Sequence, residues 1–140
     1  MHLKIRFDSA GVDWSQVVAI LKEVGMAYYT SEIKEMSFSA SRVVVFVWEE
    51  DRLIGFGRAI SDGVCQAALY DVAVRPEYQG KGIGKMIVTQ LIGKCHGCNI
   101  LLYASPGKEH FYEKLNFRKM KTAMALFIDP EKKRERGFTE

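Results

Sequence analysis

The residues Gln79–Gly84 form the part of the sequence best suited to holding a charged ligand. They read Gln-Gly-Lys-Gly-Ile-Gly and lie between the end of an expected strand and the start of an expected helix. Main-chain N–H groups without partners at a helix start, together with the positive end of the helix dipole, favour an anion there. Glycine lets oxygen atoms approach the backbone closely, and Lys81 and Lys85 add positive charge. The run therefore predicts a pyrophosphate site that is held mainly by main-chain amides.

Two better-known phosphate loops do not match this run. A Walker A loop needs four residues between its first Gly and Gly-Lys-Ser/Thr, and neither Lys81 nor Lys85 is followed by Ser or Thr. The dinucleotide fingerprint Gly-x-Gly-x-x-Gly also fails, because Gly80, Gly82 and Gly84 are spaced two by two. A nucleotide triphosphatase and a Rossmann oxidoreductase are thereby disfavoured. The alternative is that the glycines merely end a strand and open a helix.

The pair Cys95 and Cys98 is the other motif with chemical potential, because Cys-x-x-Cys can bind zinc or take part in redox chemistry. A structural zinc site needs two more ligands, and the sequence has no second cysteine pair and no His-x-x-x-His. With Cys65 the cysteines number three, an odd set that argues against a secreted disulfide framework. We expect reduced thiols and no bound metal.

Length and composition indicate one compact domain. The chain has 140 residues, of which 48% are hydrophobic, enough for a core without disulfides or metal. The formal net charge of +3 falls short of the strongly basic balance of nucleic-acid binders. No stretch approaches the ~20 apolar residues that span a bilayer. We expect a cytoplasmic protein without nucleic-acid or membrane partners, with one domain over 1–128 and a charged tail over 129–140.

The chain before the glycine-rich run is patterned as four strands and at least one helix. A capping box at Asp13 begins a helix that Gly25 ends, and Met26–Ser41 holds a second helix or an ordered loop capped by Thr30 or Ser31. Alternating or β-branched apolar residues predict strands at Leu3–Phe7, Val43–Trp48, Leu53–Ile60 and Ala67–Val74. The last three strands follow one another through short polar turns, so we expect them to be antiparallel.

The chain after the run is patterned as a helix, a crossover and a terminal group of short elements. A helix is expected over 83–94, and its length allows the next strand, Ile100–Ala104, to lie parallel to the one before it. The remaining expected elements are a short helix from Ser105 and Pro106 to Leu115, Asn116 in a left-handed position, strands at Phe117–Lys121 and Ala123–Ile128, and a frayed charged end over Glu131–Arg136. The fold class is thus α/β (α+β), with a mixed, mostly antiparallel central sheet flanked by helices.

Two segments resemble motifs of the GCN5-related N-acetyltransferases. Residues Asp71–Gly84 are similar to the family's Gln/Arg-x-x-Gly-x-Gly/Ala motif and its preceding strand. Phe111–Phe117 resembles the family's Phe-Tyr-x-x-Leu-Gly-Phe, with Asn116 in place of the glycine. The spacing and the order of elements extend the resemblance over nearly the whole chain. It implies splayed parallel strands that bind acetyl-coenzyme A, and transfer of the acetyl group to an amine.

The resemblance also implies roles for individual residues. The main chain of Val72 and Val74 would meet the pantetheine arm, and a strand N–H of Val74 or Ala73 would stabilise the oxyanion. The residues expected to hold the pyrophosphate are Gln79, Gly80, Lys81, Gly82, Ile83, Gly84 and Lys85.

Amine acetylation also requires proton transfer. Tyr112 matches the family's general acid, because a phenol with a pKa of about 10 is protonated at neutral pH. Asp71 is the favoured base, with Glu49, Glu50 and His110 as alternatives and a capping or exposed role for Asp71 also open.

The acceptor site is expected among aromatic and charged residues of the early segment and the central hairpin, namely Tyr28, Tyr29, Trp48, Phe56 and Arg58. Such a lining suits the primary amine of an aryl or hydrophobic small molecule, attacking acetyl-coenzyme A directly in a ternary complex. A protein or peptide acetyltransferase and a non-catalytic acyl-coenzyme A binding module are the alternatives. The apolar segment Ala123–Ile128 predicts a homodimer.

Overall fold

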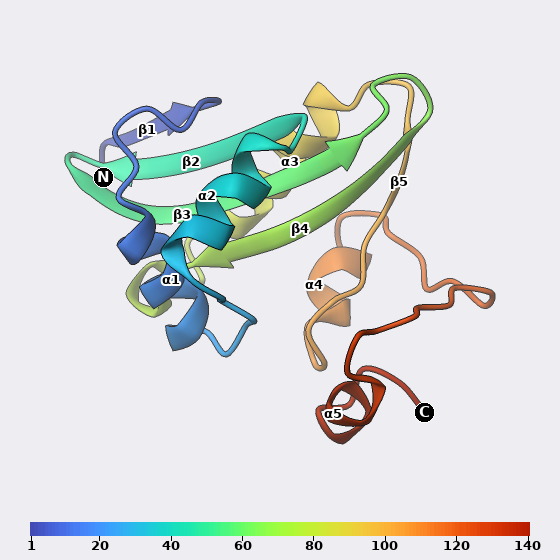
Figure 1. Ribbon diagram of the computed structural model, residues 1–140. Helices are drawn as coiled ribbons and strands as arrows, with labels where there is room; N and C mark the ends of the chain where they lie inside the picture. The colour runs from blue at the N-terminus through green and yellow to red at the C-terminus, as the bar shows by residue number, and fades with distance from the viewer. The chain divides into compact units, whose positions relative to one another are not determined.

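Five strands form one sheet in the computed structural model, which describes the whole chain from Met1 to Glu140. The strands are β1 (Leu3–Arg6), β2 (Val43–Glu49), β3 (Arg52–Ser61), β4 (Gln66–Val74) and β5 (Asn99–Leu101), in this order across the sheet. Neighbours pair antiparallel from β1 to β4, and β5 pairs parallel to β4 (Figure 1). The predicted mixed, mostly antiparallel sheet is confirmed. Residues Met1–Leu102 form one compact unit and Tyr103–Glu140 a second.

Helices cover both faces of the sheet, with α1 (Trp14–Glu23) and α2 (Ser31–Ser39) on one face and α3 (Ile83–Lys94) on the other (Figure 1). Both expected capping residues cap their helices: the Asp13 side chain accepts from the Ser15 N–H, and Thr30 accepts from the Ile33 N–H. The reciprocal side-chain bond that would complete a capping box at Asp13 is not formed. The second helix of the sequence analysis therefore exists, and the third has the bounds expected of it.

Aromatic rings fill the face that α1 and α2 cover. Between ring centroids, Phe38 lies 5.3 Å from Phe46 and 5.8 Å from Phe56. Trp14 packs on Phe38 at 5.4 Å and on Phe46 at 5.9 Å. Phe46 and Phe56 are fully buried, so these pairs add to the burial of a large apolar area. This cluster fixes both helices on the strands.

The opposite face is built for a close approach of α3. A Cβ at Gly55 would lie 3.1 Å from Ile87 Cδ1, and one at Gly57 would lie 3.0 Å from Ile87 Cγ2 and 3.1 Å from a methyl carbon of Leu91. The two glycines of β3 therefore let the helix pack directly on the sheet. The beginning of α3, where the glycine-rich run lies, is positioned by this contact.

The two parallel strands stay together over a short distance only. Pairing joins Gln66–Ala68 to Asn99–Leu101, and β4 continues to Val74 without β5. The expected buried strand Ile100–Ala104 is therefore shorter than predicted, and Leu101 is exposed. The reason is that a strand needs a hydrogen-bonded partner, and β4 provides one only up to Ala68.

The second unit contains two short helices, α4 (Glu109–Glu113) and α5 (Pro130–Glu135), and no strand. The strands predicted at Phe117–Lys121 and Ala123–Ile128 are wrong, because neither segment has a ladder partner. The predicted frayed end is wrong as well, since the Asp129 side chain accepts from the Lys132 N–H at 3.1 Å and caps α5.

The turn before α4 also differs from the expectation. Ser105 and Pro106 do not begin the helix: the Lys108 N–H donates to the Ser105 carbonyl at 2.9 Å, and Gly107 has a φ of 91°. The left-handed glycine interrupts helical geometry, so the helix starts at Glu109. Asn116 does take the predicted left-handed position, with a φ of 71°.

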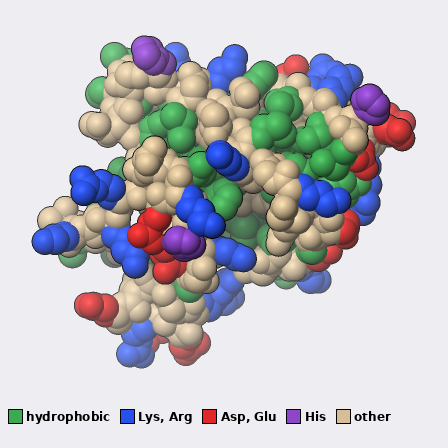
Figure 2. All heavy atoms as spheres, turned by 180° about the vertical axis from the view of Figure 1, so that it is seen from behind, with side chains coloured by type: hydrophobic (Ala, Val, Ile, Leu, Met, Phe, Trp, Pro, Cys, Tyr) green, Lys and Arg blue, Asp and Glu red, His purple; other side chains and the backbone are tan.

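The surface seen in Figure 2 mixes charges of both signs, with Lys and Arg side chains interspersed with Asp and Glu over that face. None of the helices has both the length and the apolar character that crossing a bilayer requires.

Candidate functional site

The glycine-rich run forms an open helix start. Gly80 and Gly82 have φ angles of 78° and 84°, and Gly82 is the N-cap of α3 without a side chain to satisfy the first turn. The first main-chain bond inside the helix runs from the Met86 N–H to the Gly82 carbonyl at 3.0 Å. The preceding N–H groups have no partner within the helix, so they can bind an anion.

Polar contacts fix the short 3-10 turn η1 (Pro76–Tyr78) that leads into this run. The Tyr78 hydroxyl donates to Glu49 at 2.6 Å, and this hydrogen bond raises the pKa of Tyr78. The Arg52 guanidinium pairs with Glu77 at 2.9 Å. Lys81 Nζ lies 5.5 Å from the centre of the Tyr78 ring, at the rim of the open helix start. Glu49, an alternative base in the sequence analysis, is therefore occupied in holding the turn.

The end of β4 turns alternate main-chain groups away from β3. The Arg75 N–H donates to the Ile54 carbonyl at 2.8 Å, so these two residues form a hydrogen-bonded pair of the antiparallel ladder. Such pairs recur at every second residue, and Ala73 with its partner Phe56 is therefore the next one. The main-chain groups of Val72 and Val74 consequently face the side from which β5 is missing. Ala73 was expected to share in ligand binding through its N–H, but its main chain belongs to the β3 ladder.

Asp71 lies in an irregularity of β4 and in a network of ion pairs. Its φ is 56°, and the register with β3 shifts between Phe56 and Arg58. Lys34 Nζ donates to both Asp71 carboxylate oxygens at 3.1 and 3.0 Å, and Arg58 Nε donates to one of them at 2.7 Å. Lys34 is buried, and the Asp71 carboxylate is its counter-charge. The two contacts hold the carboxylate in a fixed position, and the role of Asp71 as the base stays a prediction.

The predicted acceptor residues separate into two groups. Tyr29 and Arg58 both adjoin the Asp71 network, since the Tyr29 ring centre lies 5.3 Å from Lys34 Nζ. Tyr28 instead lies against Lys22, with 5.7 Å between Lys22 Nζ and the ring centre. The structure thus brings together two of the five predicted residues, Tyr29 and Arg58.

Trp48 and Phe56 lie outside this group, contrary to the expectation. Trp48 packs against the aromatic core from β2, where its neighbours across the strands are Lys4 and Leu53, and its Nε1 atom has no hydrogen-bond partner. Phe56 is completely buried in the same core. Alternate positions of a strand share one face, and Val44, Phe46 and Trp48 all face the core in this way.

Lys34 is the site residue that sequence reasoning missed. It is 3% exposed and shares the buried face of α2 with Phe38, four residues on. Lys34 occupies a helix position where the periodicity predicts an apolar residue. That mismatch was the available signal, because a buried lysine almost always has a partner of opposite charge.

Tyr112, the predicted acid, belongs to the second unit. It is half-buried on α4, with ring-centre distances of 4.9 Å to Phe111 and 5.8 Å to Phe117. Burial raises the pKa of the Tyr112 phenol. The proton that a general acid must give away is thus held firmly at neutral pH, and the catalytic role stays a prediction.

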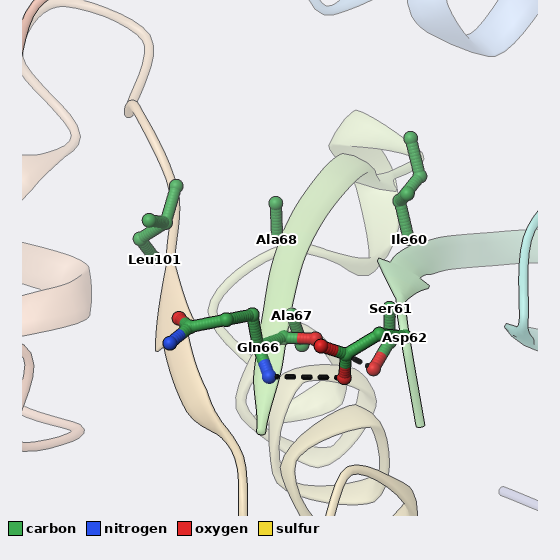
Figure 3. A pocket seen from close by; sticks show the side chains of 7 residues that line it. All are labelled: Ile60, Ser61, Asp62, Gln66, Ala67, Ala68 and Leu101. Atoms are coloured by element: carbon green, nitrogen blue, oxygen red, sulfur yellow. Dashed lines mark hydrogen bonds between the residues drawn. The ribbon is translucent and has the colours of Figure 1, made fainter. Parts of the chain in front are cut away.

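A shallow pocket lies where β4 and β5 are still paired (Figure 3). Ala68 is the cross-strand neighbour of both Ile60 and Leu101, so the three apolar side chains point to one side. Arg58, two residues before Ile60 on β3, projects from the same face of the sheet. The apolar pocket and the Asp71 network therefore occupy neighbouring positions on one face.

No cluster of three or more His, Cys, Asp or Glu side chains in residues 1–140 is arranged to hold a metal ion. Cys65, Cys95 and Cys98 are free thiols. Cys95 is buried at the end of α3, and burial raises the pKa of its thiol. The Cys65 thiol donates to Asp62 at 3.1 Å, which raises the pKa of that thiol too.

Comparison with known proteins identifies N-acetyltransferases as relatives of this chain. The family model described as an acetyltransferase (GNAT) domain matches residues 40–119. Serotonin N-acetyltransferase 2, chloroplastic, of Oryza sativa subsp. japonica is 33% identical over 123 residues, which cover 81% of this chain and 60% of that protein. GCN5-related N-acetyltransferase 1, chloroplastic, of Arabidopsis thaliana is 30% identical over 118 residues, with the same coverage of 81% and 60%. The chain thus spans about 60% of the length of these two curated relatives.

Solved structures of the same kind share the fold. A probable acetyltransferase of unknown function from meticillin-resistant Staphylococcus aureus superposes with a TM-score of 0.81 at 25% identity, covering 91% of this chain and 99% of that one. A putative acetyltransferase of the GNAT family from Xanthomonas campestris pv. campestris gives a TM-score of 0.79 at 20% identity, covering 91% and 94%.

Proposed function

This chain belongs to the GNAT family, the GCN5-related N-acetyltransferases, and we propose that it transfers an acetyl group from acetyl-coenzyme A to a primary amine of a small molecule. The open start of α3 carries the donor half of this proposal, because Gly80 and Gly82 leave space for an anion beside unpaired N–H groups. No heavy atom comes within 4 Å of a Cβ built on either glycine.

Acetyl-coenzyme A would supply an activated acyl group and a thiolate leaving group. Ile83, Gly84 and Lys85 would offer main-chain N–H groups to its pyrophosphate, with Lys81 at the rim. Val72 and Val74 would offer outward-facing main-chain groups to the pantetheine arm. The Val74 N–H is the donor that we assign to the negative charge developing on the acetyl oxygen.

Two proton transfers accompany the reaction. The attacking amine must be neutral, and an alkyl amine with a pKa near ~10 is mostly ammonium at pH 7, so a base or a water molecule removes a proton. Tyr112 would give its phenolic proton to the departing sulfur, and its raised pKa keeps that proton in place until the sulfur becomes anionic.

The apolar pocket at Ile60, Ala68 and Leu101 supports a small acceptor with an apolar body. It lies on the same face as Arg58, and thus beside the strand that leads to Val72 and Val74. Ala68 and Val74 are about 20 Å apart along β4, so only an elongated amine could place its apolar part in this pocket and its nitrogen at the acetyl group. Ala68→Phe should fill the pocket, raising the KM for the acceptor while leaving the Kd for coenzyme A unchanged.

The deciding experiment measures binding of acetyl-coenzyme A by calorimetry and thiol release with aryl amines, alkyl amines and peptides as acceptors, each corrected for hydrolysis. Release with small amines supports the proposal. Release with peptides alone would make the chain a protein or peptide acetyltransferase. Binding without release would indicate a non-catalytic binding module, and no binding would contradict the assignment of Gln79–Lys85.

We also propose that the protein forms a homodimer through Ala123–Ile128. Met124, Leu126 and Ile128 alternate along this segment and are 96%, 101% and 104% exposed. A second copy would cover these side chains and provide the strand partner that the segment lacks within the chain.

A further inference from the structure

Tyr29 and Asp71 share an uncommon backbone conformation and the same lysine. Both have a φ of 56°, in the left-handed region that is costly for residues other than glycine and most of all for a bulky side chain. The Tyr29 ring centre lies 5.3 Å from Lys34 Nζ, and the Asp71 carboxylate lies 3.0 Å from it. Strained residues persist where surrounding contacts hold them, and they concentrate at functional sites.

We propose that Lys34 is a positioning residue that holds Tyr29 on the acceptor side and Asp71 on the acetyl side in one arrangement. The inference rests on the proposed acetyl transfer and adds a residue that neither the family motifs nor the predicted site includes. Lys34 acts through Asp71, whose place in the chain is one residue before Val72 and three before Val74. Fixing the irregularity at Asp71 fixes the direction of the main-chain groups that follow.

Burial makes the ion pair between Lys34 and Asp71 costly to break. The Lys34 side chain is 4% exposed and the Asp71 side chain 10% exposed, so neither charge is well solvated and each depends on the other. Lys34 is the one charged residue of the chain that is buried. The contact joins α2 to β4 across 37 positions of sequence.

Arg58 provides the second contact of the Asp71 carboxylate. Its Nε donates at 2.7 Å, its Nη1 donates to Ser41 at 3.2 Å, and its guanidinium carbon lies 5.6 and 5.3 Å from the ring centres of Phe38 and Tyr70. Removal of Lys34 therefore leaves Asp71 and Arg58 as a charge-balanced pair, and a Lys34→Met protein should still fold. Removal of Asp71 instead leaves two cations without a counter-charge.

The test compares Lys34→Met, Asp71→Asn and the double variant in thiol release, using the acceptor found most active with wild type. Each single variant should lower kcat/KM for the acceptor by about 10²-fold, the cost of a small misplacement of reacting groups. The Kd for coenzyme A should rise by a smaller factor than kcat/KM falls, because Val72 and Val74 would shift whereas the open start of α3 that holds the pyrophosphate is untouched. The double variant should lose no more than roughly threefold beyond either single one, because the two residues act as a unit.

The pH profile separates positioning from base catalysis. In all three variants the acid limb of kcat/KM should persist, because it belongs to ionisation of the acceptor amine. Loss of that limb in Asp71→Asn alone, with Lys34→Met near wild type, would make Asp71 the base and overturn the inference. Glu131→Gln is the matched control, because it breaks an exposed pair with Arg134 at 2.6 Å and should leave kcat/KM unchanged.

Tyr29→Gly gives a second test that does not depend on the folding of a buried-charge variant. Tyr29 is 62% exposed, and glycine takes a positive φ without strain, which offsets the entropy that glycine adds to the unfolded chain, so the variant should be about as stable as wild type. The inference expects a raised KM for the acceptor nonetheless. Full activity in Tyr29→Gly would overturn it, whereas absence of turnover in wild type would contradict the proposed function instead.

Discussion

The Gln79 side-chain amide donates to the Val74 carbonyl at 2.9 Å, which ties the first residue of the glycine-rich run to the last residue of β4. The contact explains how a loop with two left-handed glycines keeps a defined direction. It also shows that the Val74 carbonyl points away from β3, in agreement with the alternation of hydrogen-bonded pairs between β3 and β4. The proposed pyrophosphate and pantetheine sites are thus connected through one side chain.

Gln79→Glu tests this connection. A carboxylate in place of the amide cannot donate to the Val74 carbonyl, and it puts a negative charge beside the proposed pyrophosphate site. We expect affinity for coenzyme A to fall by about tenfold or more, equal to ~1.4 kcal/mol, as measured by calorimetry. Gln90→Glu, the same change in a later turn of α3, is the control and should bind coenzyme A as wild type does.

Gly82→Ala tests the backbone geometry of the helix start. A Cβ at Gly82 would meet no atom within 4 Å, so any effect comes from its φ of 84°. We expect a loss of roughly 1–2 kcal/mol in the free energy of unfolding and weaker binding of coenzyme A. Gly93→Ala lies in the last turn of the same helix without a positive φ, and it should gain up to roughly 0.5–1 kcal/mol. Equal stability changes in the two variants would contradict the argument.

The course of α3 could be predicted because its signals are local. Gly82 ends the preceding turn, and Ile83, Ile87 and Leu91 mark one face of the helix. The same holds for the caps at Asp13 and Thr30, whose side chains contact N–H groups two or three residues away.

Contacts between distant segments could not be predicted in this way. Lys34 meets Asp71 across 37 positions, and no local pattern names the partner of a buried lysine. The apolar alternation of Ala123–Ile128 is typical of a strand, yet a strand requires a ladder partner that the sequence does not identify. Trp48 was misplaced for a related reason, since an aromatic residue in a strand can face the core or a ligand, and only the register with β1 and β3 decides.

Tyr112→Phe tests the proposed acid. The variant keeps the ring contacts with Phe111 and Phe117 but loses the proton donor. We expect kcat to fall by about 10²-fold or more, with the Kd for coenzyme A and the unfolding temperature unchanged. Because burial raises the pKa of this phenol, the wild-type enzyme should lose activity through Tyr112 ionisation only above the ordinary phenol range of about 10. A wild-type kcat in the variant would leave Tyr112 a packing residue.

Asp62→Asn tests the turn between β3 and β4. The Asp62 carboxylate accepts from the N–H groups of Val64, Cys65 and Gln66 at 2.8, 2.9 and 3.1 Å, and these bonds hold its pKa well below the ordinary range. A lowered pKa contributes stability that is present above the unfolded-state value of about 3.9 and is lost as the pH falls through the folded-state value.

Wild type should therefore unfold at a higher temperature than Asp62→Asn at neutral pH, and the difference should shrink as the pH is lowered below about 4. Thermal unfolding followed by circular dichroism from pH 7 to pH 2 measures both curves. A difference that stays constant over this range would mean that the shape of the side chain, and not its charge, stabilises the turn.

Leu126→Lys tests the proposed homodimer. Leu126 lies in the middle of the alternating exposed residues Met124, Leu126 and Ile128, and a lysine there would put a charge into the centre of an apolar contact. If a second copy covers this segment, light scattering after size exclusion should show a dimer for wild type and a monomer for the variant. Lys121→Glu, an exposed charge change before the same segment, is the control and should remain a dimer. A monomeric wild type would rule out the homodimer. The three side chains would then be expected to contact another partner, because fully exposed apolar residues at every second position favour association.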